Sequence, residues 1–153
     1  MIAVVQRVSE AAVRVEAAIV GTIGPGLVAL VAVCQDDTDA DVKWTARKIV
    51  ELRIFPNADK HFDLDVKSAG GSILLVSNFT VAAATRQGRR PSFDAAADAQ
   101  KGEQLFAALV DAIRNTGAPV QTGRFRADMK VQLVNDGPVT LILDSRESTG
   151  GTC

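Results

Sequence analysis

An uninterrupted apolar run in the first quarter of the chain reads Leu27-Val28-Ala29-Leu30-Val31-Ala32-Val33-Cys34. Eight apolar residues without polar alternation are typical of a strand buried on both faces. The turn-forming segment Gly21–Gly26, which contains Gly-Pro-Gly, precedes the run. Ser72–Ser77, with the sequence SILLVS, has the same character. The two runs predict buried strands.

Two helices are expected around these strands. The acidic segment Asp36–Asp41 favours a helix start, because carboxylates stabilise a helix N-terminus. Asp94–Thr116 is the second helical stretch, and Gly117 stands where a C-terminal cap is expected. The predicted inner faces consist of apolar residues at helical spacing: Val42, Ala46, Ile49 and Val50 in the first helix, and Leu105, Phe106, Leu109, Val110 and Ile113 in the second.

The remaining strands are predicted at the two ends of the chain. Ile2–Val8 and Ala11–Glu16 lie before the apolar run, and Asp128–Asn135 and Val139–Asp144 close the chain as a hairpin. A short strand is expected at Val120–Thr122. The resulting order, β-β-β-α-β-α-β-β-β, predicts an α+β fold in which a mostly antiparallel sheet carries two helices.

Length and composition indicate one globular domain. The chain has 153 residues, 47% of them hydrophobic and 23% charged. We assign residues 1–145 to the domain and expect the polar, Gly-rich tail 146–153 to be disordered. The net charge of −1 shows no basic excess, so a nucleic-acid partner would have to be met by a local patch.

Several functional classes are excluded by residue counts. No apolar run approaches the ~20 residues that span a bilayer, and the first residues do not resemble a signal peptide. His61 is the one histidine, which excludes a mechanism or metal site that needs two. Cys34 and Cys153 are isolated, and no phosphate-cradling glycine loop occurs. We therefore expect no metal ion.

Three connecting segments have unusual chemistry, and each has a structural and a functional interpretation. Ser77–Thr80 (SNFT) is either a polar strand end or a group of donors for a carbonyl or oxyanion. Asn135–Thr140 is either an ordinary turn with a trans proline or a rigid device that presents carbonyl groups. Arg86–Arg90 is either a solvated basic loop or a phosphate contact, and Arg124 and Arg126 add two more cations.

Taken together, these segments resemble the D-aminoacyl-tRNA deacylase family, formerly called D-Tyr-tRNA deacylase. The resemblance extends from Met1 to about Asp144, and its strength comes from the number, order and spacing of the motifs. The motifs are Val4–Val8, Ala12–Val13, Gly21–Gly24, Lys48–Phe55, Gly70–Leu74, Gly88–Phe93, Thr122–Phe125, Ala127–Met129 and Asn135–Thr140.

The resemblance implies a cytoplasmic enzyme that hydrolyses the ester between a D-amino acid and tRNA, and that also accepts glycine. It implies a homodimer with a strongly curved, barrel-like sheet, no organic cofactor and no membrane association. In the family the pair matching Gly137-Pro138 is cis and enters the active site of the other subunit, where its carbonyls hold the substrate's amino group and exclude an L side chain.

Roles for individual residues follow from the same resemblance. We expect the catalytic segment to be Ser77, Asn78, Phe79 and Thr80, with the ribose 2′-hydroxyl taking part and backbone N–H groups stabilising the oxyanion. Thr80 has been proposed as a nucleophile in the family, but the sequence offers it no obvious base. The remaining expected roles are support of the Gly-Pro loop by Arg7, pocket lining by Phe125 and Met129, and tRNA contact by Arg86, Arg89, Arg90 and Arg126.

The chain departs from the family pattern at three places. Asn78 stands where glutamine is usual, Ala82-Ala83-Ala84 replaces a usual Tyr-Ala-Asp, and Arg126 replaces a usual glycine. These departures leave two alternatives: a non-catalytic nucleic-acid-binding dimer that kept the fold, and a hydrolase of another small ester on the same scaffold.

Overall fold

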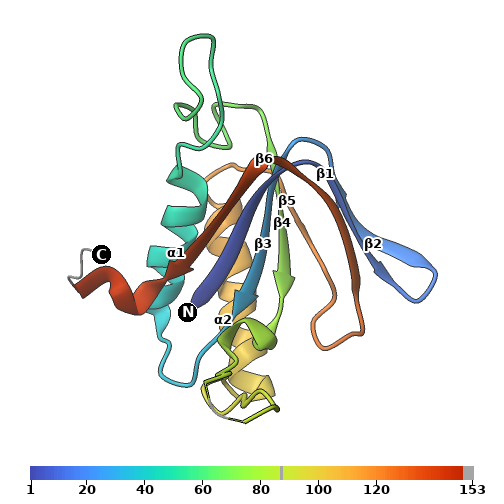
Figure 1. The fold of residues 1–153 in the computed structure, drawn as a ribbon, viewed down its shortest axis with the longest axis vertical. Helices are drawn as coiled ribbons and strands as arrows, with labels where there is room; N and C mark the ends of the chain where they lie inside the picture. The colour runs from blue at the N-terminus through green and yellow to red at the C-terminus, as the bar shows by residue number, and fades with distance from the viewer. Residues whose placement is uncertain (87, 150–153) are drawn as a thin grey trace.

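The computed structural model describes residues 1–86 and 88–149. η2 covers the first part of the predicted tail, and the last four residues of that tail lie outside the described residues. The elements in chain order (Figure 1) are β1 (Ile2–Val15), β2 (Ala18–Ile23), β3 (Gly26–Ala32), α1 (Asp39–Glu51), β4 (Ser72–Ser77), the 3-10 helix η1 (Phe79–Ala82), α2 (Ala99–Arg114), β5 (Val120–Thr122), β6 (Lys130–Asp144) and the 3-10 helix η2 (Ser145–Thr149).

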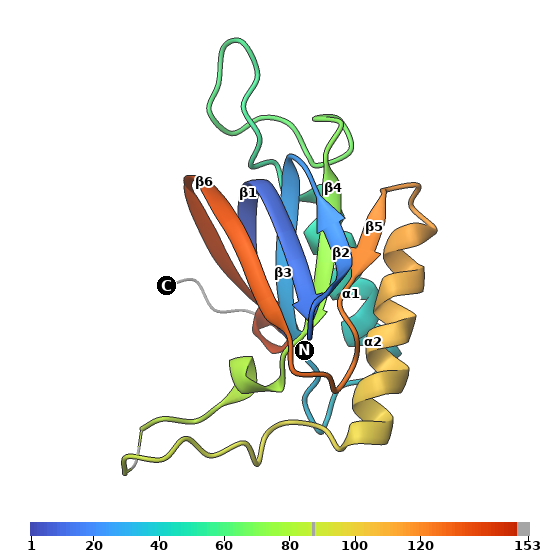
Figure 2. The same cartoon turned by 90° about the vertical axis from the view of Figure 1, so that its right-hand side faces the viewer.

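The sheet is mixed, where the sequence predicted a mostly antiparallel one. β1 pairs antiparallel with β2, β3 and β6, whereas β4 runs parallel to β3 and β5 runs parallel to β4. The sheet curves until β2 comes close to β5, since a Cβ built on Gly21 would lie 2.7 Å from the carbonyl oxygen of Thr122. The result is a nearly closed, barrel-like sheet with two helices (Figure 2).

The two apolar runs form neighbouring strands, as their composition predicts. β3 and β4 lie side by side, and their side chains alternate between two hydrophobic clusters. Leu27 and Ile73 face the helices, where they belong to one hydrophobic cluster with Ile49 of α1 and Leu109 of α2. Val28, in contrast, points into the concave side of the sheet. Burial on both faces explains why neither strand shows polar alternation.

Both helices begin at side-chain caps. Thr38 caps α1 and forms a capping box with Asp41, and Asp98 caps α2 by accepting a hydrogen bond from the Lys101 N–H. α2 is shorter than predicted, because residues 94–97 precede its cap and the helix ends at Arg114. All nine apolar residues predicted for the inner helix faces are buried, which confirms the predicted packing.

The long strands β1 and β6 correct the predicted hairpin. The sequence suggested a turn at Asp136–Pro138 between two strands, but β6 continues through this segment, and both of its halves pair with β1. Gln6 pairs with Thr140 and Val8 pairs with Asn135, so residues 136–139 bulge from the ladder opposite Arg7. The two predicted strands at the N-terminus are likewise one strand with an irregularity near Ser9.

Candidate active site

The Ser77–Thr80 segment lies where β4 passes into η1. The Asn78 N–H extends the strand ladder by donating to the carbonyl of Val31 at 2.7 Å. Its side chain then caps η1, with Oδ1 accepting from the Thr80 N–H at 3.2 Å and from the Thr80 hydroxyl at 2.5 Å. The Thr80 hydroxyl therefore donates to an amide oxygen, which is too weak a base to take its proton.

Phe79 is the first residue of η1 and combines a backbone donor with an exposed ring. Helix-opening N–H groups lack intrahelical acceptors, and no acceptor for the Phe79 N–H occurs among residues 1–86 and 88–149. The Phe79 side chain is 57% exposed and meets the Phe93 ring edge-to-face, with 5.1 Å between the ring centroids. The segment thus offers an open N–H group beside an aromatic surface.

The bulge at residues 136–139 exposes Gly137 and Pro138 at the surface. The peptide bond between them is cis, and Gly137 has φ +128°, a backbone conformation that favours glycine. The Asn135 amide closes the base of the bulge, because its Nδ2 donates to the Thr140 hydroxyl and its Oδ1 accepts from the Val139 N–H, both at 2.8 Å. The bulge is therefore a shaped loop rather than a flexible turn.

Arg7 packs beneath the bulge and is only 8% exposed. Its Nε donates to the carbonyl of Asp136 at 3.2 Å and lies 3.1 Å from the carboxylate of the same residue. Its Nη1 donates to the carbonyl of Ile54, and the guanidinium lies 6.0 Å from the centre of the Phe62 ring. Arg7 thereby ties the bulge to the segment that follows α1.

The two segments lie at opposite ends of the sheet within one chain. Arg7, opposite the bulge, pairs with Leu27 at the start of β3, whereas Asn78 binds Val31 near its end. These positions are four residues apart, or ~13 Å along a strand. In Figure 1 the bend of β6 lies at the upper end of the sheet and η1 lies below its lower end. A single chain therefore does not bring Pro138 to Ser77–Thr80.

Phe125 and Met129, both predicted to line the pocket, pack into different hydrophobic clusters. The Phe125 ring lies 6.3 Å from that of Phe106 on the helix side, and a Cβ built on Gly102 would lie 3.4 Å from it. Met129 packs on the concave side, where its sulfur is close to Gly123. Both side chains are partly buried, so each retains some surface that a ligand can reach.

The arginines predicted to contact tRNA occupy exposed loops. Ala84 and Ser92 form an antiparallel bridge, and Arg86, Arg89 and Arg90 lie between them in a segment that we call the basic arm (84–92). Gln87, inside the arm, is outside the described residues. Arg126 lies in the β5–β6 connection with φ +59°, in the left-handed region that favours glycine. In Figure 2 both loops lie towards the same end of the molecule as η1.

The ionisable side chains provide no nucleophile–base pair in the described part of the chain. His61 is exposed, and Cys34 is buried. Burial and the nearby Asp37 carboxylate raise the pKa of the Cys34 thiol, which keeps it protonated and unreactive. Asp37 is itself occupied by the Met1 ammonium group.

Residues 1–86 and 88–149 hold neither a metal-binding cluster nor a membrane-spanning helix. No group of three or more His, Cys, Asp or Glu side chains is placed to hold a metal ion. Among these residues, no helix has the length and apolar character needed to cross a membrane.

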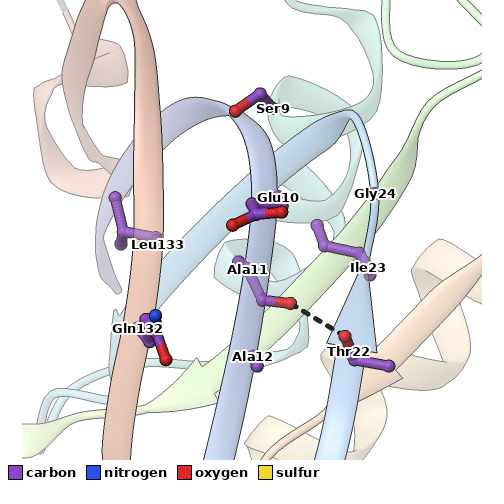
Figure 3. Close-up of a pocket in the computed structure, with 9 residues that line it drawn as sticks. All are labelled: Ser9, Glu10, Ala11, Ala12, Thr22, Ile23, Gly24, Gln132 and Leu133. Atoms are coloured by element: carbon purple, nitrogen blue, oxygen red, sulfur yellow. Dashed lines mark hydrogen bonds between the residues drawn. The ribbon is translucent and has the colours of Figure 1, made fainter.

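A surface hollow of about 400 Å³ lies elsewhere, between β1, β2 and β6 (Figure 3). The residues lining it are Ser9, Glu10, Ala11, Ala12, Thr22, Ile23, Gly24, Gln132 and Leu133. The Thr22 hydroxyl donates to the Ala11 carbonyl at its wall, and Glu10 is its one ionisable side chain. None of the predicted site residues lines this hollow, so it is not the predicted active site.

Sequence reasoning missed two aromatic residues beside the candidate segments. Phe93 contacts Phe79, and Phe62 lies against Arg7. The available signal was their setting: each phenylalanine stands in a polar or basic loop, where no helical or strand periodicity explains a large apolar side chain.

The chain is similar to proteins of one family. A family model described as D-Tyr-tRNA(Tyr) deacylase matches residues 4–144. A Geobacter sulfurreducens protein named D-aminoacyl-tRNA deacylase is 51% identical over 152 residues, which cover 99% of this chain and 100% of that protein. A Methylococcus capsulatus protein of the same name is 51% identical over 143 residues, covering 94% of each chain.

Two solved structures have a similar fold. The c-Myc DNA Unwinding Element Binding Protein superposes with a TM-score of 0.90 at 35% identity, covering 94% of this chain and 98% of that one. A structure described as a probable eukaryotic D-amino acid tRNA deacylase superposes with a TM-score of 0.78 at 16% identity, covering 93% and 97%. The second likeness concerns the fold alone.

Proposed function

The chain belongs to the D-Tyr-tRNA(Tyr) deacylase family, and we propose that it hydrolyses the ester that joins a D-amino acid to tRNA, releasing free tRNA. The observation that carries this proposal is about 50% identity, over nearly the whole chain, to relatives named D-aminoacyl-tRNA deacylase. The reaction takes place in the cytoplasm, and its RNA partner is the aminoacylated 3′ end.

The active site is shared between two copies of the chain in a homodimer. The bulge and the Ser77–Thr80 segment lie at opposite ends of one sheet, so Pro138 reaches such a segment only in a partner. The exposure of Gly137 and Pro138 at the surface of the described chain supports this arrangement. Each dimer then contains two equivalent sites.

Selection for D-amino acids takes place at the α-carbon. The carbonyl oxygens of Gly137 and Pro138 accept hydrogen bonds from the substrate ammonium group, and the bulge occupies the space of an L side chain. Glycine and D-amino acids fit, so glycyl-tRNA is also a substrate. The contacts that Arg7 and Asn135 make with the bulge support this role, because a selector must hold its shape when the wrong substrate arrives.

The chemical step uses the backbone of the site and the RNA itself. Water attacks the ester carbonyl, the bond to the ribose oxygen breaks, and the leaving oxygen takes up a proton with the ribose 2′-hydroxyl taking part. The Phe79 N–H stabilises the oxyanion that forms. This assignment is supported by the open Phe79 donor and by the lack of a base near Thr80 within the described residues.

Hydrolysis of charged tRNA tests the activity. We expect purified protein to release D-Tyr from D-Tyr-tRNA and glycine from glycyl-tRNA, and to leave L-Tyr-tRNA intact. Failure to cleave both D-Tyr-tRNA and glycyl-tRNA would refute the proposed activity.

Subunit complementation tests the shared site. A Phe79→Pro chain and a Gly137→Ala chain are each expected to be nearly inactive. Mixed by denaturation and refolding, they should regain about a quarter of wild-type activity, because about half of the dimers are mixed and each mixed dimer has one intact site. A site contained in one chain predicts no gain on mixing.

Thr80→Ala tests the chemical step. We expect less than about a tenfold loss of kcat, since the lost interaction is one hydrogen bond with Asn78. Thr80→Ser is the control that keeps the hydroxyl. Complete loss of hydrolysis by Thr80→Ala with the fold intact would favour Thr80 as the nucleophile.

A second candidate is a non-catalytic nucleic-acid-binding dimer. The likeness to the c-Myc DNA Unwinding Element Binding Protein, at 35% identity, favours it specifically. Under this hypothesis Arg86, Arg89, Arg90 and Arg126 bind DNA or RNA phosphates in a salt-dependent manner without turnover. The charged-tRNA assay together with a salt titration of binding separates the two candidates.

A further inference from the structure

Phe79 and Phe93 form an exposed aromatic pair at the edge of the Ser77–Thr80 segment. Their rings meet at 71° with 5.1 Å between the centroids, and the side chains are 57% and 37% exposed. An edge-to-face contact stabilises the pair but leaves ring faces in water. Two large aromatic residues that are in contact but not covered form a surface on which a flat ligand can stack.

The arm next to the pair carries three arginines, and Asp94, which accepts a hydrogen bond from the Ser92 hydroxyl, is the acid beside Phe93. Phe93 follows Ser92, which closes the basic arm by pairing with Ala84. Arg86, Arg89 and Arg90 are exposed on the arm, and no ion pair to them occurs among the described residues. The aromatic pair therefore joins the residue with the open N–H, Phe79, to the base of an arm that carries three arginines.

This combination matches the chemistry of single-stranded RNA binding. Arginines pair with phosphates, and aromatic faces stack on unpaired bases. An apolar protein partner would not require the three cations, whereas an RNA strand requires both parts. We propose that Phe79 and Phe93 form a stacking platform for one unpaired base at the 3′ end of the substrate RNA, an inference that rests on the proposed function.

Phe93 is a positioning residue under this proposal. It has no contact with the reacting ester and acts by holding the RNA so that the ester reaches the Phe79 N–H. Its loss should therefore raise KM and leave kcat nearly unchanged. Phe93→Leu keeps the apolar volume but removes the flat face, and Phe93→Tyr keeps the face.

A binding experiment with uncharged RNA tests the platform. The probes are three RNA hairpins that end in single-stranded CCA, each with 2-aminopurine at one of the last three positions, because stacking quenches this base. With wild-type protein, at least one probe should be quenched. Phe93→Leu should bind that probe roughly tenfold more weakly and without quenching. Phe93→Tyr should behave as wild type, and so should Ile19→Ala, which changes an exposed apolar residue on β2.

The outcomes separate the platform from the proposed activity. Equal quenching and affinity for wild type and Phe93→Leu would overturn the platform. A Phe93→Leu protein with a changed oligomeric state and unchanged RNA affinity would also overturn it, and would assign the pair to an interface between copies. The proposed activity is judged on wild-type hydrolysis of D-Tyr-tRNA alone, so a wild type that hydrolyses without Phe93-dependent stacking refutes only the platform.

Discussion

The Ser77–Thr80 segment and the Gly137–Pro138 bulge both offer backbone groups, but they are held in place in different ways. The first is organised locally, because Asn78 caps the helix that its own neighbours begin. The second has local contacts from Asn135 but also depends on a residue far away in sequence, since Arg7 donates to the carbonyl of Asp136 and to that of Ile54. In our proposal the first supplies a donor and the second supplies acceptors. One half of the site can therefore form from a short stretch of sequence, whereas the other needs contacts between distant residues.

Phe79→Pro should produce the largest effect, on the donor side. Proline is tolerated at the first position of a helix, and Asn78 before it already has an extended backbone with φ −148° and ψ 90°. The substitution therefore removes the N–H with little disturbance of η1. We expect kcat to fall by about 10²–10³-fold, as for loss of one oxyanion donor.

Phe79→Ala is the matched control, because it removes the same ring but keeps the N–H. We expect a higher KM and a kcat close to that of wild type, measured as D-Tyr-tRNA hydrolysis under saturating substrate. Equal losses of kcat in the two variants would show that the ring, and not the donor, carries the effect.

Gly137→Ala should produce the next largest effect, on the acceptor side. The residue has φ +128°, and a Cβ there would lie 2.7 Å from the Val139 side chain and 3.1 Å from the Arg7 guanidinium. The bulge must shift, and a misplacement of about 1 Å can lower kcat/KM by roughly 10²-fold. The kcat/KM values for D-Tyr-tRNA and L-Tyr-tRNA measure the loss of activity, and their ratio measures any loss of selectivity.

Gly24→Ala provides the comparison for Gly137→Ala. Nothing lies within 4 Å of a Cβ at Gly24, and its φ is outside the left-handed region. We expect wild-type kcat/KM and stability. A similar loss of activity in both variants would contradict a specific requirement for glycine in the bulge.

The same contrast explains what the sequence could predict. The buried strands Leu27–Cys34 and Ser72–Ser77 and both helix faces follow from local patterns, and the structure confirms them. The hairpin predicted at Asp136–Pro138 is wrong, because Gly-Pro suggests a turn and only pairing with β1 shows that both flanks belong to one strand. Parallel pairing of β3 with β4 is equally invisible locally, since it depends on how α1 crosses the sheet.

In the site, too, local features can be predicted from the sequence and long-range contacts cannot. Ser77–Thr80 was identified as one segment, and its capping role is a local property of Asn78. Phe93 and Phe62 were missed because their partners, Phe79 and Arg7, are 14 and 55 residues away in sequence. Contacts of this kind have no local signature, which is why the resemblance to a family, and not periodicity, identified the Gly-Pro pair.

Arg7→Gln tests the long-range support of the bulge. Loss of the guanidinium leaves the carbonyl groups of Asp136 and Ile54 without these donors, which should lower the free energy of unfolding by about 1–3 kcal/mol. Urea denaturation measures this change. Arg14→Gln, on the exposed face of the same strand, should change stability by less than about 0.5 kcal/mol. If both substitutions have the same small effect, the bulge holds its shape without Arg7.

Arg126→Gly should have the smallest effect, and it concerns a second left-handed residue. Arg126 has φ +59°, which costs a residue with a side chain roughly 1 kcal/mol that glycine does not incur. Position 137 requires glycine, because a Cβ there would lie against the Val139 and Arg7 side chains. Position 126 tolerates arginine, because it lies exposed in a loop. We therefore expect Arg126→Gly to raise the free energy of unfolding by up to about 1 kcal/mol in urea denaturation, and Arg124→Gly in the same loop to lower it slightly.

If Arg126 binds phosphate, its loss should also reduce the salt dependence of tRNA binding by about one counterion. A stability gain without a change in salt dependence would mean that the arginine was tolerated at this position, not selected for RNA contact.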